Sequence, residues 1–142
     1  MFSVMSRYAI IPAFNEEKNI ESIVKGINEL GIKTIVVDDG STDNTFSICA
    51  NNGVIAIRHD KNQGKGEAIK SGLSYLLKSY PEFTYAIVVD ADMQYQPEET
   101  LKIFNLLETR DLDYVMGQRE WGGVPLRHRF GNFIWRKTFN VM

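Results

Sequence analysis

The feature that most constrains the fold is a repeated alternation of short apolar runs with longer helical patterns. Four runs rich in Ile, Val and Ala stand at residues 8–12, 34–37, 54–58 and 86–89. Such runs predict strands that are buried on both faces. The segments between them place apolar residues at helical spacing, as Ile20, Ile23 and Ile27 do. Because parallel strands need helical crossovers, this order predicts an α/β fold with a mainly parallel sheet.

Capping residues predict where the helices begin and end. Asn15 is expected to be the N-cap of the first helix, and Gly31 is expected to end it. Ser41 or Thr42 is expected to cap a second helix that runs to about residue 51. A loop at residues 62–67 opens the third helix. Pro97 suits the first position of a fourth helix, and a fifth strand is expected at residues 114–117.

Length and composition indicate one ordinary domain, at residues 1–142, that is 44% hydrophobic and 24% charged. The net charge of −2 gives no reason to expect nucleic acid as a partner. The single cysteine, Cys49, excludes an internal disulfide framework and is expected to be a buried hydrophobe. We find no signal-peptide pattern and no apolar stretch near the ~20 residues that span a bilayer, so a cytoplasmic location is expected.

Polar clusters follow the predicted strands at the same end each time. They are Asn15-Glu16, Asp38-Asp39, the loop at residues 62–66, Asp90 with Asp92, and Gly117-Gln118-Arg119. The carboxyl ends of parallel strands meet at one edge of a sheet, where α/β proteins bind their ligands. This regularity predicts one ligand site built from all of these clusters.

Asp90 and Asp92 come directly after an apolar strand, with Gln94 two residues further on. Alternate positions of an extended chain point to the same side, so the two carboxylates should project together. Carboxylate and amide oxygens suit Mg²⁺ or Mn²⁺, which keep positions open for phosphate oxygens. The alternative is a solvated turn at the end of the strand, where Asp is common.

The other clusters fit the remaining parts of a nucleoside diphosphate. Carboxylates near Glu16, Asp38 and Asp39 would repel phosphate but could accept hydrogen bonds from a base and a ribose. Lys65 and Arg119 could contact phosphate oxygens. We find neither a Gly-x-Gly-x-x-Gly after the first strand nor a Walker sequence around Lys65, which argues against a dinucleotide-binding domain and a P-loop.

Four motifs in order resemble those of the family 2 glycosyltransferases, and most closely the dolichyl-phosphate mannosyltransferase and polyprenyl-phosphate glycosyltransferase group. The motifs are Ile11-Pro12-Ala13-Phe14-Asn15-Glu16-Glu17, Val37-Asp38-Asp39-Gly40-Ser41-Thr42-Asp43, Asn62-Gln63-Gly64-Lys65-Gly66 and Asp90-Ala91-Asp92-Met93-Gln94. The resemblance covers roughly residues 7–140. It implies the GT-A fold and transfer of a hexose, with inversion, from a nucleotide sugar such as GDP-mannose or UDP-glucose.

The resemblance also implies roles for individual residues. Around the base and ribose it places Pro12, Ala13, Phe14, Glu16, Asp38 and Asp39. It places Asp90, Asp92 and Gln94 on the metal, with Ala91 backing the sugar diphosphate. It gives Arg119 a phosphate contact and Arg127 a place near the acceptor phosphate, so that Asp92, Arg119 and Arg127 are the expected catalytic residues.

The implied acceptor is a polyprenyl or dolichyl phosphate, whose anionic oxygen could attack the anomeric carbon without a catalytic base. His59 and His128 match no motif and are expected to be surface residues. The acceptor-side segment, at about residues 120–142, is expected to be truncated. The alternatives are a shortened piece, a natural short form, or a piece that a partner subunit or a second copy completes. Residues 127–142 form a basic, amphipathic pattern that suits either a membrane surface or a helix packed on a missing segment.

Two other functions fit parts of the pattern. An idle nucleotide-sugar-binding module or subunit would bind donor without transferring or hydrolysing it. A sugar nucleotidyltransferase would also use a parallel sheet and acidic metal ligands. It would need a glycine-rich, basic phosphate loop near the N-terminus, whereas the segment at residues 12–17 is acidic.

Overall fold

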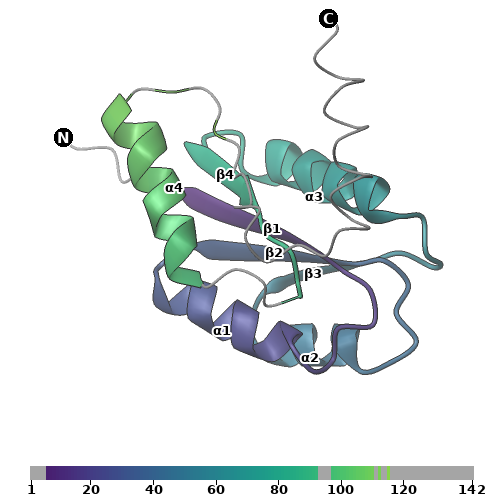
Figure 1. Cartoon of the computed structure of the whole chain (residues 1–142). Coiled ribbons are helices and arrows are strands. Elements are labelled where there is room, and N and C mark those ends of the chain that lie inside the picture. The colour runs from purple at the N-terminus through teal and green to yellow at the C-terminus, as the bar shows by residue number, and fades with distance from the viewer. Residues whose placement is uncertain (1–5, 93–96, 111, 113–114, 116–142) are drawn as a thin grey trace, which may run out of the picture.

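Strands and helices alternate along the described chain. The computed structural model describes residues 6–92, 97–110, 112 and 115. Its elements are β1 (Arg7–Ala13), α1 (Ile20–Glu29), β2 (Lys33–Asp38), α2 (Thr45–Asn51), β3 (Ile55–Arg58), α3 (Lys65–Ser79), β4 (Tyr85–Val88) and α4 (Pro97–Arg110). The four strands form one parallel sheet in the order β3-β2-β1-β4 (Figure 1). The predicted α/β fold with a parallel sheet is confirmed.

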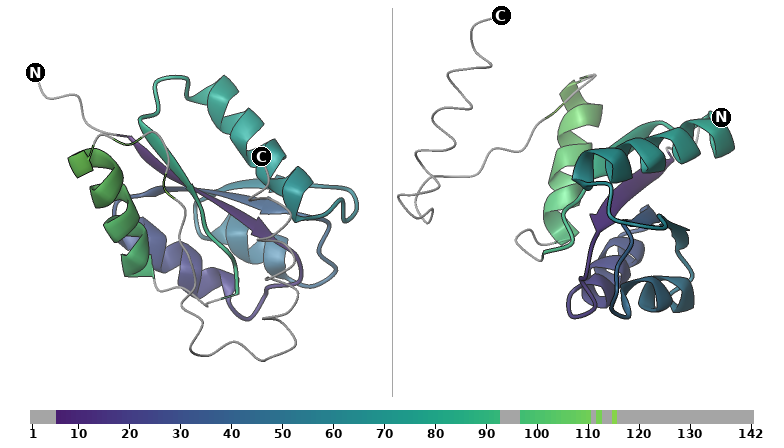
Figure 2. Two further views of the ribbon diagram at one scale, coloured as in Figure 1. Left: turned by 45° about the horizontal axis from the view of Figure 1, so that its top comes forward. Right: turned by 90° about the vertical axis from the view of Figure 1, so that its right-hand side faces the viewer.

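The sheet lies between two helical layers, and each layer has its own hydrophobic core. Helix α3 covers one face, while α1, α2 and α4 lie on the other (Figures 1 and 2). Along β1, Ala9 and Ile11 pack in the core beneath α1 and α4, whereas Tyr8 and Ile10 pack in the core beneath α3. All four side chains are at most 1% exposed. Burial on both faces is the reason that the strands read as continuous apolar runs.

Helix α3 lies close to the sheet because Gly72 faces it. A Cβ at this position would be 2.6 Å from Cγ2 of Ile10.

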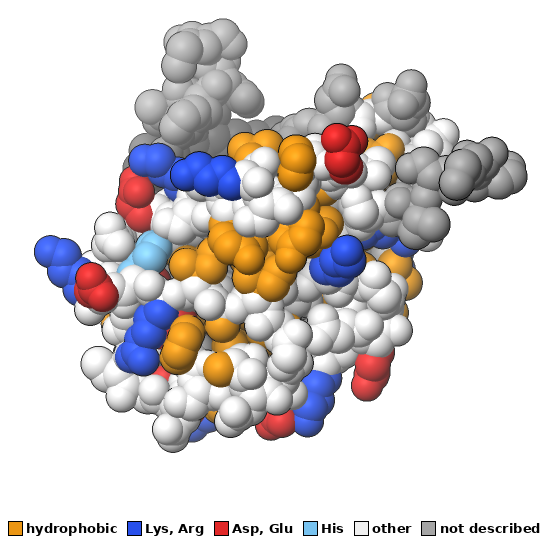
Figure 3. All heavy atoms as spheres, turned by 180° about the vertical axis from the view of Figure 1, so that it is seen from behind, with side chains coloured by type: hydrophobic (Ala, Val, Ile, Leu, Met, Phe, Trp, Pro, Cys, Tyr) orange, Lys and Arg blue, Asp and Glu red, His pale blue; other side chains and the backbone are white. Residues whose placement is uncertain are grey.

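On the side seen from behind, hydrophobic side chains gather near the middle of the molecule, with charged side chains around them (Figure 3). In the described part of the chain, we find no helix with the length and apolar character needed to span a membrane.

The predicted strand boundaries agree with the observed ones within one residue at each end. Gly31 follows α1 with φ 72°, and Pro97 opens α4, as predicted. Cys49 is 1% exposed, as predicted, and burial, with a smaller contribution from the charge of Asp38, raises the pKa of its thiol to about 11.

Two helix starts were predicted wrongly. Helix α1 begins at Ile20 rather than beside Asn15, which has φ 55° and whose side-chain oxygen accepts a hydrogen bond from the Thr42 amide. Helix α2 begins at Thr45, and the carboxylate that accepts the Thr45 amide belongs to Asp43. Asn15, Ser41 and Thr42, which were predicted as caps, instead join the loops that follow β1 and β2. The Ser41 hydroxyl accepts the Asn15 amide at 2.9 Å.

The predicted fifth strand at residues 114–117 lies outside the described residues, apart from Val115. The same holds for Gln94, Arg119, Arg127 and His128, and for the predicted acceptor-side segment.

Candidate functional site

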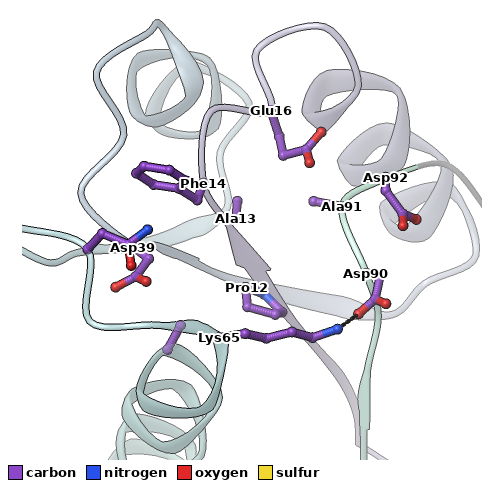
Figure 4. A pocket seen from close by; sticks show the side chains of 11 residues that line it. Pro12, Ala13, Phe14, Glu16, Asp39, Lys65, Asp90, Ala91 and Asp92 are labelled. Atoms are coloured by element: carbon purple, nitrogen blue, oxygen red, sulfur yellow. Dashed lines mark hydrogen bonds and ion pairs between the residues drawn. The ribbon is translucent and has the colours of Figure 1, made fainter. Parts of the chain in front are cut away.

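One pocket opens at the carboxyl edge of the sheet, where the sequence predicted a ligand site. Its volume is about 220 Å³. Its lining comes from the ends of β1, β2 and β4 and from the start of α3 (Figure 4). The lining residues are Pro12, Ala13, Phe14, Glu16, Asp39, Asn62, Lys65, Ala68, Asp90, Ala91 and Asp92. Nine of these eleven were predicted individually as site residues. Asn62 was expected at the site only as part of the loop at residues 62–66, and Ala68 was not predicted.

One side of the pocket carries two carboxylates and a lysine. Strand β4 ends at Val88, so Asp90 and Asp92 lie beyond it, and both still line the pocket. The Asp90 carboxylate accepts a hydrogen bond from Nζ of Lys65 at 2.5 Å (Figure 4). The side chains of Lys65 and Asp90 are 58% and 29% exposed. This side of the pocket is therefore polar, charged and open to water.

The opposite side is formed by Asp39, which is only 3% exposed. Its Oδ1 accepts hydrogen bonds from Nδ1 of His59 at 2.6 Å and from the Gln63 amide at 2.9 Å. Its Oδ2 accepts the Gly64 amide at 2.8 Å. Burial by itself would raise the pKa of Asp39, but the bonds from Gln63, His59 and Gly64 together outweigh it and lower the pKa below its ordinary value. Asp39 thus stays ionised and fixes the loop that leads into α3.

Gly40 allows this loop to approach so closely. It has φ 75°, and a Cβ there would lie 2.6 Å from the carbonyl carbon of Lys61. A residue with a side chain would be strained by both the backbone conformation and the contact. The tight turn after Asp39 therefore requires glycine.

Asp38 is not brought to the pocket, although it was predicted to contact the base or ribose. Its side chain is 1% exposed, and its Oδ1 accepts the Ser41 amide at 3.1 Å. Its Oδ2 lies 3.3 Å from Nε of Arg58 as an ion pair without hydrogen-bond geometry. Successive residues of a strand point to opposite sides, which separates Asp38 from Asp39.

The loop after β1 supplies an aromatic and an acidic side chain. Phe14 is 44% exposed, and Glu16 faces the pocket from the same loop (Figure 4). The backbone of this loop is held by α2, since the Glu16 amide donates to Oγ1 of Thr45 at 2.8 Å. An exposed ring on a fixed loop can serve as a stacking surface for a planar ligand.

The prediction that His59 is a surface residue was wrong. His59 is 9% exposed, and its Nε2 lies 2.9 Å from the Ser71 hydroxyl of α3. It follows β3 directly, and the β2–β3 register pairs Asp38 with Arg58, which places His59 beside Asp39. The order of the strands would have revealed this contact, but the sequence pattern around His59 did not.

The described residues offer a divalent cation two carboxylates, those of Asp90 and Asp92. Among these residues there is no group of three or more acidic, His or Cys side chains that could hold a metal. Two carboxylates fit Mg²⁺ or Mn²⁺, which take few protein ligands when phosphate supplies the rest. The Lys65 ammonium group on Asp90 also shows that this position attracts a cation. The donor set therefore fits the expected ion.

The fold and the pocket together define a class: a parallel α/β domain whose strands end in a polar, partly acidic ligand site. The chain matches the family model for glycosyl transferase family 2 over residues 8–140 and belongs to that family. The resemblance seen in the motifs is confirmed.

The chain is similar to proteins of known and unknown activity. An uncharacterized protein of Methanocaldococcus jannaschii is 41% identical to this chain, over 89% of the length of this chain and 57% of the length of that protein. The UDP-N-acetylglucosamine–dolichyl-phosphate N-acetylglucosaminyltransferase of Methanococcus voltae is 34% identical, over 88% of this chain and 58% of its own. The chain thus spans less than two thirds of these relatives.

A solved structure with a similar fold is that of glucosyl-3-phosphoglycerate synthase from Mycobacterium tuberculosis with Mn²⁺ and UDP-glucose. It is 25% identical, with a TM-score of 0.55, over 73% of this chain and 39% of that one. The fold is the GT-A fold of glycosyltransferases, as expected from the motifs.

Proposed function

We propose that this chain forms the donor-binding part of a glycosyltransferase that moves a hexose from a nucleoside diphosphate sugar to a polyprenyl phosphate. The observation that carries the proposal is the division of one pocket into two different sides. Asp90, Asp92 and Lys65 form a charged side suited to a metal and a diphosphate, while Phe14 and Asp39 form a side suited to a base. The family and the dolichyl-phosphate relative support the reaction class.

On the diphosphate side, Asp90 and Asp92 would hold Mg²⁺ or Mn²⁺, with Gln94 as a further ligand. When bound, the ion would neutralise the charge that develops on the leaving nucleoside diphosphate. Lys65 and Arg119 would contact phosphate oxygens, and Ala91, which is 5% exposed, would leave room for the sugar diphosphate beside the backbone.

The acceptor needs no catalytic base from the protein. A phosphate monoester is already anionic near neutral pH, so its oxygen can attack the anomeric carbon directly, with inversion. Catalysis would then consist mainly of positioning and electrostatic stabilisation. We assign Arg127 to the acceptor phosphate and Asp92 and Arg119 to the reacting diphosphate. A lipid acceptor would bring the protein to the cytoplasmic membrane surface.

We further propose that the base is uracil rather than guanine. Among the described residues, three protein groups donate hydrogen bonds to the Asp39 carboxylate, two of them to Oδ1, which leaves one acceptor position on Oδ2. Uracil presents one N–H on its pairing edge, whereas guanine presents two adjacent donors that suit two adjacent acceptors. The relatives that use UDP sugars agree with uracil.

Calorimetric titration with UDP-glucose, UDP-N-acetylglucosamine and GDP-mannose, each with and without Mn²⁺, tests the donor site. We expect UDP sugars to bind at least about tenfold more tightly than GDP-mannose, which corresponds to one hydrogen bond to a charged group. Binding should depend on Mn²⁺. Lys25→Ala, an exposed change on α1 that removes a surface ion pair with Glu21, is the control. Equal binding of the GDP sugar would contradict the uracil assignment, and Mn²⁺-independent binding would contradict the metal site.

An idle nucleotide-sugar-binding module is the second candidate, because the roles assigned to the described pocket residues concern the donor and the metal alone. Incubation with a UDP sugar, Mn²⁺ and a short-chain polyprenyl phosphate separates the two functions. Formation of a glycosyl polyprenyl phosphate supports the transferase. Donor binding with neither transfer nor hydrolysis supports a module that is completed by a partner subunit or a second copy.

A further inference from the structure

Lys65 holds a position that the stability of its helix does not explain. It is the first residue of α3, preceded by Gly64 with φ 94°. The N-terminus of a helix carries partial positive charge, so a lysine in the first turn is unfavourable there. Its stem nevertheless crosses the pocket, and its ammonium group lies 2.5 Å from Oδ1 of Asp90 (Figure 4). The contact joins the beginning of α3 to the segment that follows β4.

This contact places a protein cation on a carboxylate that the proposed function assigns to the metal. Asp90 and Asp92 both line the pocket, and Lys65 reduces the negative charge there when no ligand is bound. A divalent cation that binds through Oδ1 of Asp90 must therefore displace the ammonium group. The Lys65 side chain is 58% exposed and has four rotatable methylenes, so it can leave without rearranging the core.

We propose that Lys65 is an internal counter-ion that moves from Asp90 to the diphosphate when the metal binds, and so couples the binding of metal and donor. The proposal rests on the proposed donor site. Metal alone would displace Lys65 and leave its charge without a carboxylate. A diphosphate alone would attract Lys65 and leave Asp90 facing the phosphate. Bound together, the metal pairs with Asp90 and the diphosphate pairs with Lys65, so every charge has a partner.

Coupling of this kind is reciprocal, so either ligand must raise the affinity of the other by the same factor. A metal that bridges carboxylates and phosphate produces coupling by itself. The specific contribution of Lys65 is to weaken the binding of metal in the absence of nucleotide. Removing the lysine must therefore strengthen the binding of metal alone and weaken the binding of the nucleotide in the presence of metal.

The test measures Mn²⁺ binding alone, by the loss of the electron paramagnetic resonance signal of free Mn²⁺, and UDP binding at saturating Mn²⁺, by calorimetry. In Lys65→Met we expect Mn²⁺ alone to bind about two- to fivefold more tightly, the range for release of an exposed ion pair. UDP should bind about tenfold more weakly, because a charge-assisted hydrogen bond to phosphate is lost. The coupling factor should fall accordingly. Lys65→Arg keeps the positive charge, so its affinities for Mn²⁺ alone and for UDP with Mn²⁺ should stay close to those of the wild type.

Lys70→Met is the matched control, since it removes the same charge from an exposed position of the same helix, where Lys70 pairs with Glu67. It should change neither affinity. Unchanged Mn²⁺ affinity in Lys65→Met, with UDP binding still Mn²⁺-dependent, would overturn the role of Lys65 and leave the donor site intact. Failure of the unsubstituted protein to bind UDP or GDP with Mn²⁺ would instead overturn the donor site, and the role of Lys65 with it.

Discussion

The two sides of the pocket hold their carboxylates in opposite ways. Asp39 is 3% exposed and accepts three hydrogen bonds from His59, Gln63 and Gly64. The Asp90 side chain is 29% exposed and, among the contacts described, accepts one hydrogen bond, from a lysine that can move away. The first carboxylate belongs to the framework of the fold, whereas the second is available for exchange between cations.

This difference matches what the two ends of a nucleotide sugar require. A base is recognised by shape and by a few fixed hydrogen bonds, which a rigid, preorganised wall provides. A diphosphate arrives with a metal and changes charge during the reaction, which requires groups that can re-pair. Substitution of Asp39 should therefore lower both the free energy of unfolding and the affinity for the donor. Substitution of Asp92, on the diphosphate side, should lower the affinity for the donor with little change in stability.

Asp39→Ala should have the largest effect. It leaves the buried His59 ring and the Gln63 and Gly64 amides without their acceptor, which costs about 2–4 kcal/mol of unfolding free energy. Urea denaturation followed by circular dichroism measures this loss. Ser74→Ala, an exposed change in the middle of α3, is the control and should change the unfolding free energy by less than about 0.5 kcal/mol. A stability loss in Asp39→Ala no larger than that of the control would show that the Asp39 side is not the rigid one.

Asp92→Ala should leave stability within about 1 kcal/mol of wild type, because the substitution is at a partly exposed position. It should weaken Mn²⁺-dependent binding of a UDP sugar by at least about tenfold, since one of two carboxylates is removed from the ion. Calorimetry with and without Mn²⁺ measures the change, and Asp92→Asn shows whether the charge or the oxygen is needed. Normal donor binding by Asp92→Ala would refute the metal assignment.

The sequence predicted most of the features that depend on local pattern. Apolar runs located the strands within one residue, and the parallel arrangement correctly gathered Glu16, Asp39, Lys65 and Asp90 at one edge. Their convergence follows from topology alone, because every parallel strand ends at the same edge. Hence the pocket could be predicted before any side chain was placed.

The errors concern contacts that depend on pairing between distant segments. His59 is buried because β3 lies beside β2 in a register that a local pattern does not encode. Asn15 is a turn residue because the loops after β1 and β2 bond to each other, as in its contact with Thr42. Asp38 and Asp39 are adjacent, and successive residues of a strand point to opposite sides, so only one of them can face the pocket. The prediction did not apply this alternation to the pair.

Acid should weaken the hydrogen bonds that the Asp39 carboxylate accepts. The pKa of Asp39 is lowered in the folded protein, because the hydrogen bonds from Gln63, His59 and Gly64 outweigh the effect of burial. The pKa of Asp43 is lowered too: burial opposes the shift, and bonds from the Thr45 hydroxyl, the Thr45 amide and the Glu17 amide outweigh it. A carboxylate with a lowered folded pKa stabilises the fold above its ordinary pKa of 3.8. This stabilisation is lost as the pH falls through the folded value.

Urea midpoints measured between about pH 6 and pH 3 should therefore decline towards acid. The decline should be shallower in Asp39→Asn, which has no carboxylate to protonate at this position. Ser74→Ala, an exposed change on α3 that removes no titrating group, is the control and should follow the wild-type curve. Parallel curves for wild type and Asp39→Asn would contradict the assignment of acid sensitivity to Asp39.

The smallest effect is expected at the outer end of the hydrogen-bonded chain, where Ser71 lies 2.9 Å from Nε2 of His59. Ser71→Ala should cost about 0.5–1 kcal/mol, as for one neutral hydrogen bond, and leave UDP affinity within about twofold. His59→Gln should cost more and weaken UDP by several-fold, because His59 contacts Asp39 directly. Ser74→Ala, at an exposed position one turn further along α3, is the control. Equal loss of UDP affinity in Ser71→Ala and His59→Gln would mean that the rigid side extends into α3, because the helix itself would then hold Asp39 in place.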